Sequence, residues 1–166
     1  MTDSIWQTKL GDAHPGVLAT KSAFRDNVRV TAAAGEVFTV LKLLKGCGFD
    51  MLFELTAVDY LHYPDATDRY GVVYGLLNTE TGERLIVKTH VNDPDPRLSS
   101  VVPLWAGANW LEREVFDMFG VRFDGHPDLR RVLMPEEFAE HPLRKDYPLR
   151  GRGERHNFTV LTRAES

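Results

Sequence analysis

The sequence has one cysteine, no long apolar run and no overall excess of positive charge, and each lack narrows the class of protein. With Cys47 alone, the chain forms no internal disulfide and builds no cysteine-ligated zinc or iron–sulfur site of its own. No window approaches the ~18 apolar residues of a membrane-spanning helix, and the first sixteen residues, MTDSIWQTKLGDAHPG, lack the apolar centre of a secretory signal. We therefore expect a protein of a reducing compartment that reaches a membrane only through a partner.

Charge argues against general nucleic-acid binding. The net charge is −4, whereas a nucleic-acid-binding surface needs a basic footprint over a whole face. One short stretch, HPLRKDYPLRGRGERH at 141–156, is basic, with five Lys or Arg residues against two acidic ones. The hydrophobic share of 43% and the charged share of 27% are those of an ordinary globular domain. The basic stretch therefore needs a local explanation.

Residue patterns before position 92 predict a two-layer α+β domain. Apolar residues at helical spacing predict a helix over 36–45. Alternating or β-prone runs predict strands around it, and the turn-rich NTETGE joins the last two as a hairpin. A β-α-β unit that continues into antiparallel strands gives a mixed β-sheet with helices on one face. The expected strands are 28–32, 51–60, 70–77 and 84–91.

Three parts of the chain are expected. Residues 1–25 form an N-terminal segment, 26–121 the α+β body, and 122–166 an extended, Pro- and Arg-rich C-terminal arm. Four prolines fall between Pro127 and Pro148, and each biases the residue before it toward extended geometry.

The body is expected to end in a short helical stretch at 98–104 and a longer helix at 110–119. Asn109 is a good N-cap for this helix, and Glu112 stands where a capping-box acid would. Gly120 follows as a C-terminal stop. The core-facing residues are expected to be Leu111, Val115, Met118 and Phe119.

The other face of this helix is expected to carry Trp110, Glu114 and Asp117. The two acids at i, i+3 repel each other. Arg113 can help Asp117, but Glu114 needs a cation from the Arg-rich arm or from a neighbouring protein.

Residues 141–163 of the arm have too few large apolar side chains to offset the entropy of ordering them. Either the arm stays a solvated tail, or hydrogen bonds and another molecule's surface order it, as in segments that fold on binding. Aromatic and branched residues alternate with its charges, which favours the bound form.

No catalytic, cofactor or metal site is predicted. His126 and His141 lie near carboxylates, but each directly precedes a proline, where the imidazole ring more often closes a turn. The glycines of GCG at 46–48 and GRG at 151–153 lack a nucleotide-binding context, and Cys47 is expected to be a small packed residue. A small hydrolase that uses the two histidines remains an alternative.

The run EREVFDMFGVRFDGHPDLRRVLMPEEFAEHPLRKDYPLRG at 112–151 resembles the signature region of the 30-kDa subunit family of respiratory complex I, the bacterial NADH-quinone oxidoreductase. FELTAVDYLH at 53–62 extends the resemblance upstream.

The resemblance implies a non-catalytic, cofactor-free subunit of the proton-translocating enzyme that carries electrons from NADH to quinone. It would lie beside the 49-kDa quinone-site subunit and the subunit with the terminal iron–sulfur cluster. FMN and the iron–sulfur clusters would belong to partner subunits, and the complex would place the chain on the cytoplasmic side of the bacterial inner membrane. The interface residues implied are Glu114, Asp117, Arg130, Arg131, Arg144, Lys145, Asp146, Tyr147 and Arg150.

Two other functions remain open. The same domain resembles subunits of membrane-bound hydrogenases and ferredoxin-dependent complexes, in which the electron donor is not NADH. From a different class, a free-standing module would use the basic arm to bind nucleic acid or an acidic peptide.

Overall fold

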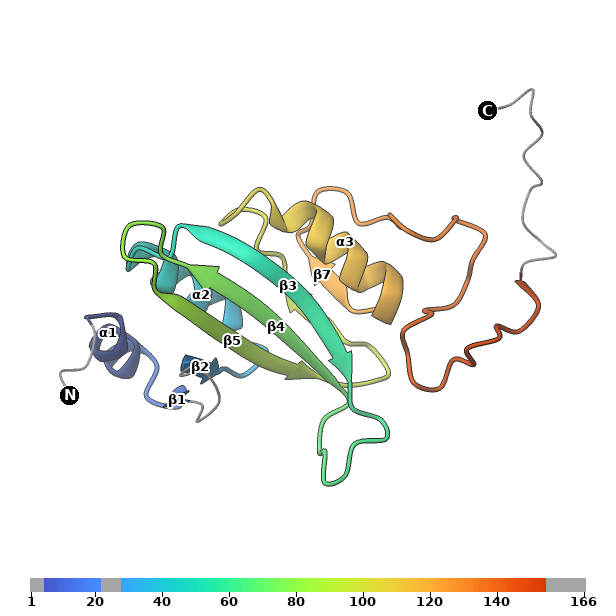
Figure 1. Ribbon diagram of the computed structural model, residues 1–166, viewed down its shortest axis with the longest axis horizontal. Coiled ribbons are helices and arrows are strands. Elements are labelled where there is room, and N and C mark those ends of the chain that lie inside the picture. Colours follow the sequence, from blue (N-terminus) through green and yellow to red (C-terminus); the bar gives the residue numbers. More distant parts are fainter. Residues whose placement is uncertain (1–4, 22–27, 155–166) are drawn as a thin grey trace.

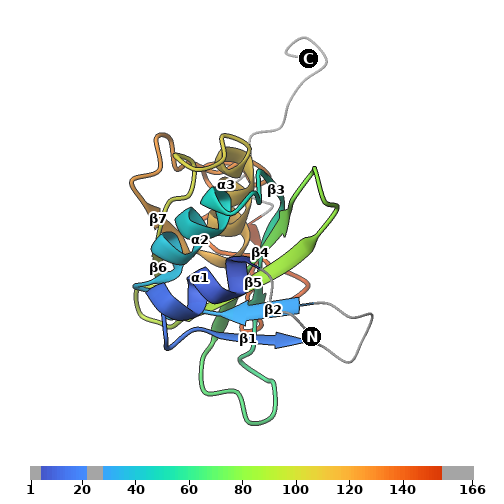
Figure 2. The ribbon, with the colours of Figure 1, turned by 90° about the vertical axis from the view of Figure 1, so that its left-hand side faces the viewer.

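The computed structural model describes residues 5–21 and 28–154. Five strands form one mixed sheet in the order β1-β2-β5-β4-β3, and β6 and β7 form a small parallel pair. Figure 2 shows the helices on one face of the large sheet, which confirms the predicted two-layer α+β fold. The elements are α1 (Ile5–Ala13), β1 (Leu18–Lys21), β2 (Val28–Thr31), α2 (Val37–Gly46), β3 (Met51–Asp59), β4 (Tyr70–Leu77), β5 (Arg84–Val91), β6 (Arg97–Ser99), α3 (Ala108–Phe119) and β7 (Arg122–Asp124).

The sheet is mixed because β2 joins it parallel to β5, whereas all its other pairings are antiparallel. The predicted β4–β5 hairpin is confirmed, with Tyr70 opposite Val91 and Leu77 opposite Arg84. Helix α2 carries the chain from β2 to β3, which lie on opposite sides of this hairpin (Figure 1).

The core lies between the sheet and the helices. Alternate residues of β4 point inward and are fully buried, as the period of two along a strand requires. They meet the apolar stripe of α2, which is the one that helical spacing predicted. These residues are Tyr70, Val72, Tyr74 and Leu76 on β4 and Val37, Val40, Leu41 and Leu44 on α2.

The segment before α3 differs from the sequence prediction. Residues 98–104 do not form a helix, because Arg97–Ser99 pair in parallel with Arg122–Asp124 and only Leu98 of this strand turns inward. Helix α3 begins at Ala108 and has Gly107 as its N-cap. The predictions of an Asn109 N-cap and a Glu112 capping box are therefore wrong, and the Glu112 side chain is buried instead.

The end of α3 agrees with the prediction. Gly120 closes the helix with φ 78, a left-handed conformation that suits glycine. Val115, Met118 and Phe119 are buried, and Leu111 packs partly buried against the same core. In the N-terminal segment, α1 and β1 are elements that the sequence patterns did not reveal.

Across 5–21 and 28–154, no helix is long and apolar enough to cross a bilayer.

Candidate partner interface

The side chain of Asp117, on the last turn of α3, holds the beginning of the arm. It is fully buried, and its Oδ2 accepts backbone N–H groups from Val132 at 3.0 Å, Leu133 at 2.7 Å and Met134 at 2.9 Å. Its Oδ1 pairs with Nη1 of Arg131 at 2.6 Å. Burial opposes the ionised form, but these donors outweigh it and hold the Asp117 pKa below its ordinary value. The carboxylate therefore fixes three successive backbone amides of the arm.

Two further side chains fasten the arm to α3. Arg113 donates from Nε to the Arg130 carbonyl at 3.0 Å and from Nη2 to the Arg131 carbonyl at 3.0 Å. Nδ1 of His141 donates to the Asp117 carbonyl at 3.0 Å. Burial lowers the His141 pKa, and the positive charges of nearby arginines lower it further, whereas the hydrogen bond to Asp117 opposes the shift. This favours the neutral ring.

A second buried carboxylate, Asp59 at the end of β3, holds the arm further along. Its Oδ2 accepts the Lys145 N–H at 2.9 Å and pairs with Nη2 of Arg69 at 3.2 Å. The same Arg69 nitrogen lies 2.8 Å from Oδ1 of Asp146. Burial opposes ionisation of Asp59, but the Lys145 and Arg69 hydrogen bonds keep its pKa below the ordinary value. Arg144, the arm residue before Lys145, donates from Nε to the Phe119 carbonyl at 2.6 Å.

The chain's own body thus holds the arm as far as Asp146, and residues 147–154 contact other residues of the arm. This corrects the expectation that the arm either stays a solvated tail or is ordered on another molecule's surface. Apolar side chains do not supply most of this ordering; two buried carboxylates, Asp117 and Asp59, supply it with several hydrogen bonds each. Figure 1 shows this segment leaving β7 and running beside α3. Residues 155–163, the last part of the 141–163 stretch expected to need another surface, lie outside the described residues.

The predicted interface residues fall into two groups. In the first, side chains contact the chain itself. Asp117 lies inside rather than on the outer face, Arg131 and Arg144 bind α3, and Asp146 binds Arg69. Tyr147 stacks edge-on against Phe138, with ring centroids 5.7 Å apart. In the second group the side chains are exposed, and their contact with a partner stays a prediction: Glu114, Arg130, Lys145 and Arg150.

The cation expected near Glu114 is not found in the described part of the chain. No ion pair there includes Glu114, whereas Arg113 lies over the Trp110 ring, 4.7 Å from its centroid. Arg130 pairs with Asp128 instead.

Apolar side chains of the arm point outward. Leu133 is 61% exposed, Leu143 50% and Leu149 fully exposed. Leu133 is notable because its own N–H is held by buried Asp117 while its side chain faces solvent. We call the exposed side chains of residues 130–150 the arm surface. Its mixture of leucine and arginine on a fixed backbone suits binding to another protein.

Both histidines proposed as alternative ligands make contacts that position backbone. Nε2 of His126 lies 3.1 Å from the Asn109 carbonyl, and its Nδ1 accepts the Asp128 N–H at 3.0 Å. The ring thus closes a turn, as its place before Pro127 predicted. No cluster of three or more His, Cys, Asp or Glu side chains suited to a metal occurs among the residues that the structure describes.

Limited trypsin digestion of the isolated chain is expected to cut first after Arg150 and Arg152. Arg150 is exposed, and the contacts of Arg152 are with other arm residues, Glu140, Glu154 and Tyr147, rather than with the body. Arg131 and Arg144 should resist longer because their side chains are bonded to α3. Intact-mass spectrometry over time orders the cuts. A first cut after Arg131 would contradict the anchoring of the arm.

An α+β body with an anchored arm that displays leucine and arginine is typical of a subunit that docks within a larger assembly. The chain belongs to the family described as respiratory-chain NADH dehydrogenase, 30 Kd subunit, whose model matches residues 30–153. The resemblance seen in the sequence is therefore confirmed.

Relatives and solved structures agree. A subunit of the NADH-quinone oxidoreductase of Trichlorobacter lovleyi is 50% identical over 125 residues, 75% of this chain and 76% of that protein. Subunit 5 of the Thermus thermophilus enzyme is 50% identical over 111 residues, 63% of this chain but only 54% of that protein. A trypsin-resistant fragment (1-134) of Nqo5 superposes with a TM-score of 0.67 at 36% identity, covering 74% of this chain and 98% of the fragment. A chain of an archaeal membrane-bound sulfane sulfur reductase gives a TM-score of 0.74 at 25% identity over 95% of this chain and 91% of that chain.

Proposed function

We propose that this chain is a non-catalytic peripheral subunit of a proton-translocating NADH:quinone oxidoreductase and that it helps assemble the quinone-proximal part of the hydrophilic arm. Its partners in this proposal are the 49-kDa quinone-site subunit and the subunit with the terminal iron–sulfur cluster. FMN and the clusters belong to partner subunits. The chain meets the cytoplasmic face of the inner membrane through the complex.

The observation that carries this proposal is the arm surface. The exposed Leu133 side chain projects from backbone that buried Asp117 holds, and Leu143 projects from backbone whose N–H donates to the Met118 carbonyl. Exposed Leu149 follows the Lys145 N–H that buried Asp59 holds. A prearranged segment loses little conformational entropy when it docks, so more of the contact energy remains for binding. Arginine and tyrosine, which are enriched at protein interfaces, lie on the same segment.

The electron donor in this proposal rests on the relatives rather than on the fold. The same fold, at a higher TM-score than the Nqo5 fragment, occurs in a complex named for sulfane sulfur rather than quinone. A fold alone does not define a reaction. NADH is preferred because the relatives at 50% identity are named as parts of NADH-quinone oxidoreductases.

The double variant Leu133→Glu/Leu149→Glu is expected to lose co-purification with the 49-kDa subunit. Two charges placed in an apolar contact must be desolvated without partners, which weakens binding by several kcal/mol, or at least about a hundredfold. The isolated variant should keep the wild-type melting temperature, because both side chains are exposed.

Ile5→Glu is the matched control. Ile5 is also an exposed apolar residue, but it lies on α1 at the far side of the body from the arm (Figure 1). It should enter the complex as the wild type does. Normal incorporation of the leucine double variant would refute the arm surface as the docking site.

A further inference from the structure

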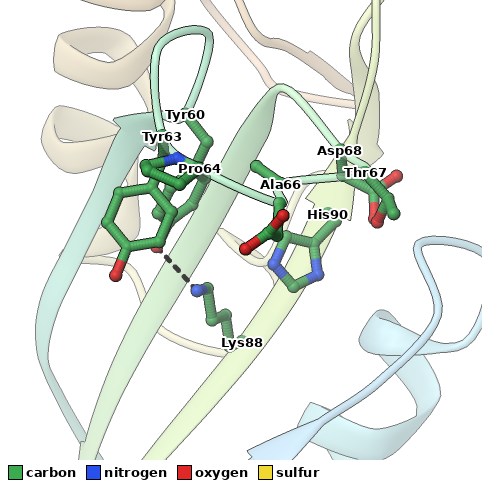
Figure 3. A pocket seen from close by; sticks show the side chains of 9 residues that line it. Tyr60, Tyr63, Pro64, Ala66, Thr67, Asp68, Lys88 and His90 are labelled. Carbon is green, nitrogen blue, oxygen red and sulfur yellow. Dashed lines mark hydrogen bonds between the residues drawn. The ribbon is translucent and has the colours of Figure 1, made fainter.

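The sheet face that carries no helix is hollowed into a cleft. Figure 2 shows α1, α2 and α3 on the opposite face. The cleft has a volume of about 590 Å³ and continues into a pocket of about 230 Å³ beneath the loop that follows β3. Tyr60, Lys88 and His90 line both, and Figure 3 shows them converging there. We call the joined space the sheet cleft. Its remaining walls include Arg29, Thr31, Val73 and Ile86.

Two glycines of β4 explain the flat floor. A Cβ on Gly71 would lie 2.7 Å from the Tyr60 ring, and one on Gly75 would lie 2.6 Å from the Phe53 ring. The two aromatic rings therefore lie directly on the strand, one at each end of the face. Between them the half-buried Val73 side chain leaves an apolar floor. A flat, partly apolar surface with aromatic borders suits an extended polypeptide.

The sheet cleft has charges of both signs: Lys88 and Arg29 line its larger part, and Asp65 and Asp68 line the pocket beneath the loop. Nζ of Lys88 donates to the Tyr60 hydroxyl at 2.6 Å and lies 4.5 Å from the centroid of the Tyr60 ring (Figure 3). Within the described residues no carboxylate forms an ion pair with it, although the side chain is half-buried. Beside it, burial and the Lys88 charge lower the His90 pKa, while Asp68 opposes the shift. Tyr60 thus holds the Lys88 ammonium group in a fixed position on the part of the cleft that Arg29 also lines, away from any ion pair among the described residues.

We propose that the sheet cleft binds an extended acidic segment of a partner subunit, with an Asp or Glu carboxylate paired to Lys88. Charge complementarity selects the acid, because a partly desolvated ammonium gains most from a carboxylate. Tyr60, Tyr63 and the apolar floor favour a polypeptide over a free anion, since tyrosine is enriched at the centre of protein interfaces. This second docking site lies apart from the arm surface and rests on the proposed function only in that the partner belongs to the same complex.

Zero-length carbodiimide coupling in the purified complex tests the pair directly, because it joins an amine only to a carboxylate that touches it. The expected product is an amide between Lys88 and an Asp or Glu of another subunit, identified by mass spectrometry. Lys88→Arg should keep the protein in the complex but abolish this product, since the guanidinium keeps the charge. No product at Lys88, or one only within its own chain, would overturn the inference.

Charge reversal gives an independent measure. Lys88→Glu is expected to reduce incorporation into the complex at least about tenfold, because it sets two carboxylates against each other. Lys42→Glu, on the exposed face of α2, is the matched control and should incorporate normally. The melting temperatures of both isolated variants show whether they fold.

The outcomes separate this inference from the proposed function. Equal incorporation of Lys88→Glu and wild type, with loss of the leucine double variant, would overturn the sheet cleft alone. Failure of the wild-type chain to co-purify with any respiratory subunit would overturn the proposed function itself.

Discussion

Replacing Asp117 by Asn is expected to release the start of the arm, at a cost of about 3–5 kcal/mol in its opening free energy, the usual penalty for removing one partner of a buried ion pair. The amide group of asparagine has one acceptor oxygen, whereas the carboxylate of Asp117 serves three backbone N–H groups and Arg131. The guanidinium of Arg131 would remain partly buried without its charge partner. Native-state hydrogen exchange at Val132, Leu133 and Met134 measures the effect residue by residue.

Glu114→Gln is the matched control for this variant. It makes the same chemical change one turn earlier on α3, at an exposed carboxylate without an ion pair in the described chain, and should change stability by less than about 0.5 kcal/mol. Unchanged exchange at 132–134 in Asp117→Asn would contradict the anchor.

Acid should release the arm in the same way. The pKa of Asp117 is lower in the folded protein than in the unfolded chain. Its stabilising contribution is therefore complete above the ordinary aspartate value and is lost as the pH falls through the lower folded value. Asp59 follows the same rule, because its pKa is also lowered. Exchange protection at 132–134 and at Lys145 should thus decline together in acid.

Local patterns predicted the body because its elements are stabilised by features visible within a few residues. The β-prone runs of β4 and β5 on either side of a turn, and the apolar stripe of α2, each bury one face. These local signals located the central strands and the covering helix. Helix α1 has only two buried residues, Trp6 and Leu10. That short pattern explains why the N-terminal helix was missed.

The candidate interface was harder to predict because its anchors are polar and distant in sequence. The contact between Asp59 and the Lys145 N–H spans 86 positions, and nothing in either local pattern links the two. Asp117 occupies a helix position that looks outward until the arm folds over it. A buried carboxylate surrounded by donors leaves no periodic signal. The sequence therefore placed Asp117 on an outer helix face and assigned no role to Asp59, whereas both are internal anchors in the structure.

Glu112 is a third buried carboxylate without a periodic signal: it was expected to cap a helix and instead lies fully buried. Its carboxylate accepts the Ser100 hydroxyl at 2.7 Å and the Val101 N–H at 2.6 Å. Nε2 of His126 is 4.0 Å away, but that ring donates to Asn109 and accepts from Asp128, the pattern of a neutral imidazole. Burial therefore raises the Glu112 pKa to about 7, despite the two hydrogen bonds.

We expect Glu112→Gln to flatten the pH dependence of stability. In the wild type the Glu112 pKa is higher in the folded protein than in the unfolded chain. The stabilising contribution of Glu112 to folding is therefore complete below about pH 4.5 and is lost as the pH rises through about 7. The shift corresponds to about 3 kcal/mol at 1.36 kcal/mol per unit. Glutamine stays neutral, still accepts the Val101 N–H through its oxygen and donates to the Ser100 hydroxyl. The unfolding free energy of the Glu112→Gln variant should therefore not decline as the pH rises from about 4.5 to about 7.

Denaturant unfolding at pH 5, 6, 7 and 8 measures this difference. The wild type and Glu114→Gln should lose the same few kcal/mol between pH 5 and 8, because neither alters the buried acid. In Glu112→Gln that loss should vanish. The stability of this variant relative to the wild type should therefore be greater at pH 8 than at pH 5. The distinction is decisive because a lost hydrogen bond would lower stability equally at every pH, whereas a buried charge acts only where the carboxylate ionises. A parallel decline in all three proteins would show that Glu112 ionises at its ordinary pH and that its burial costs nothing.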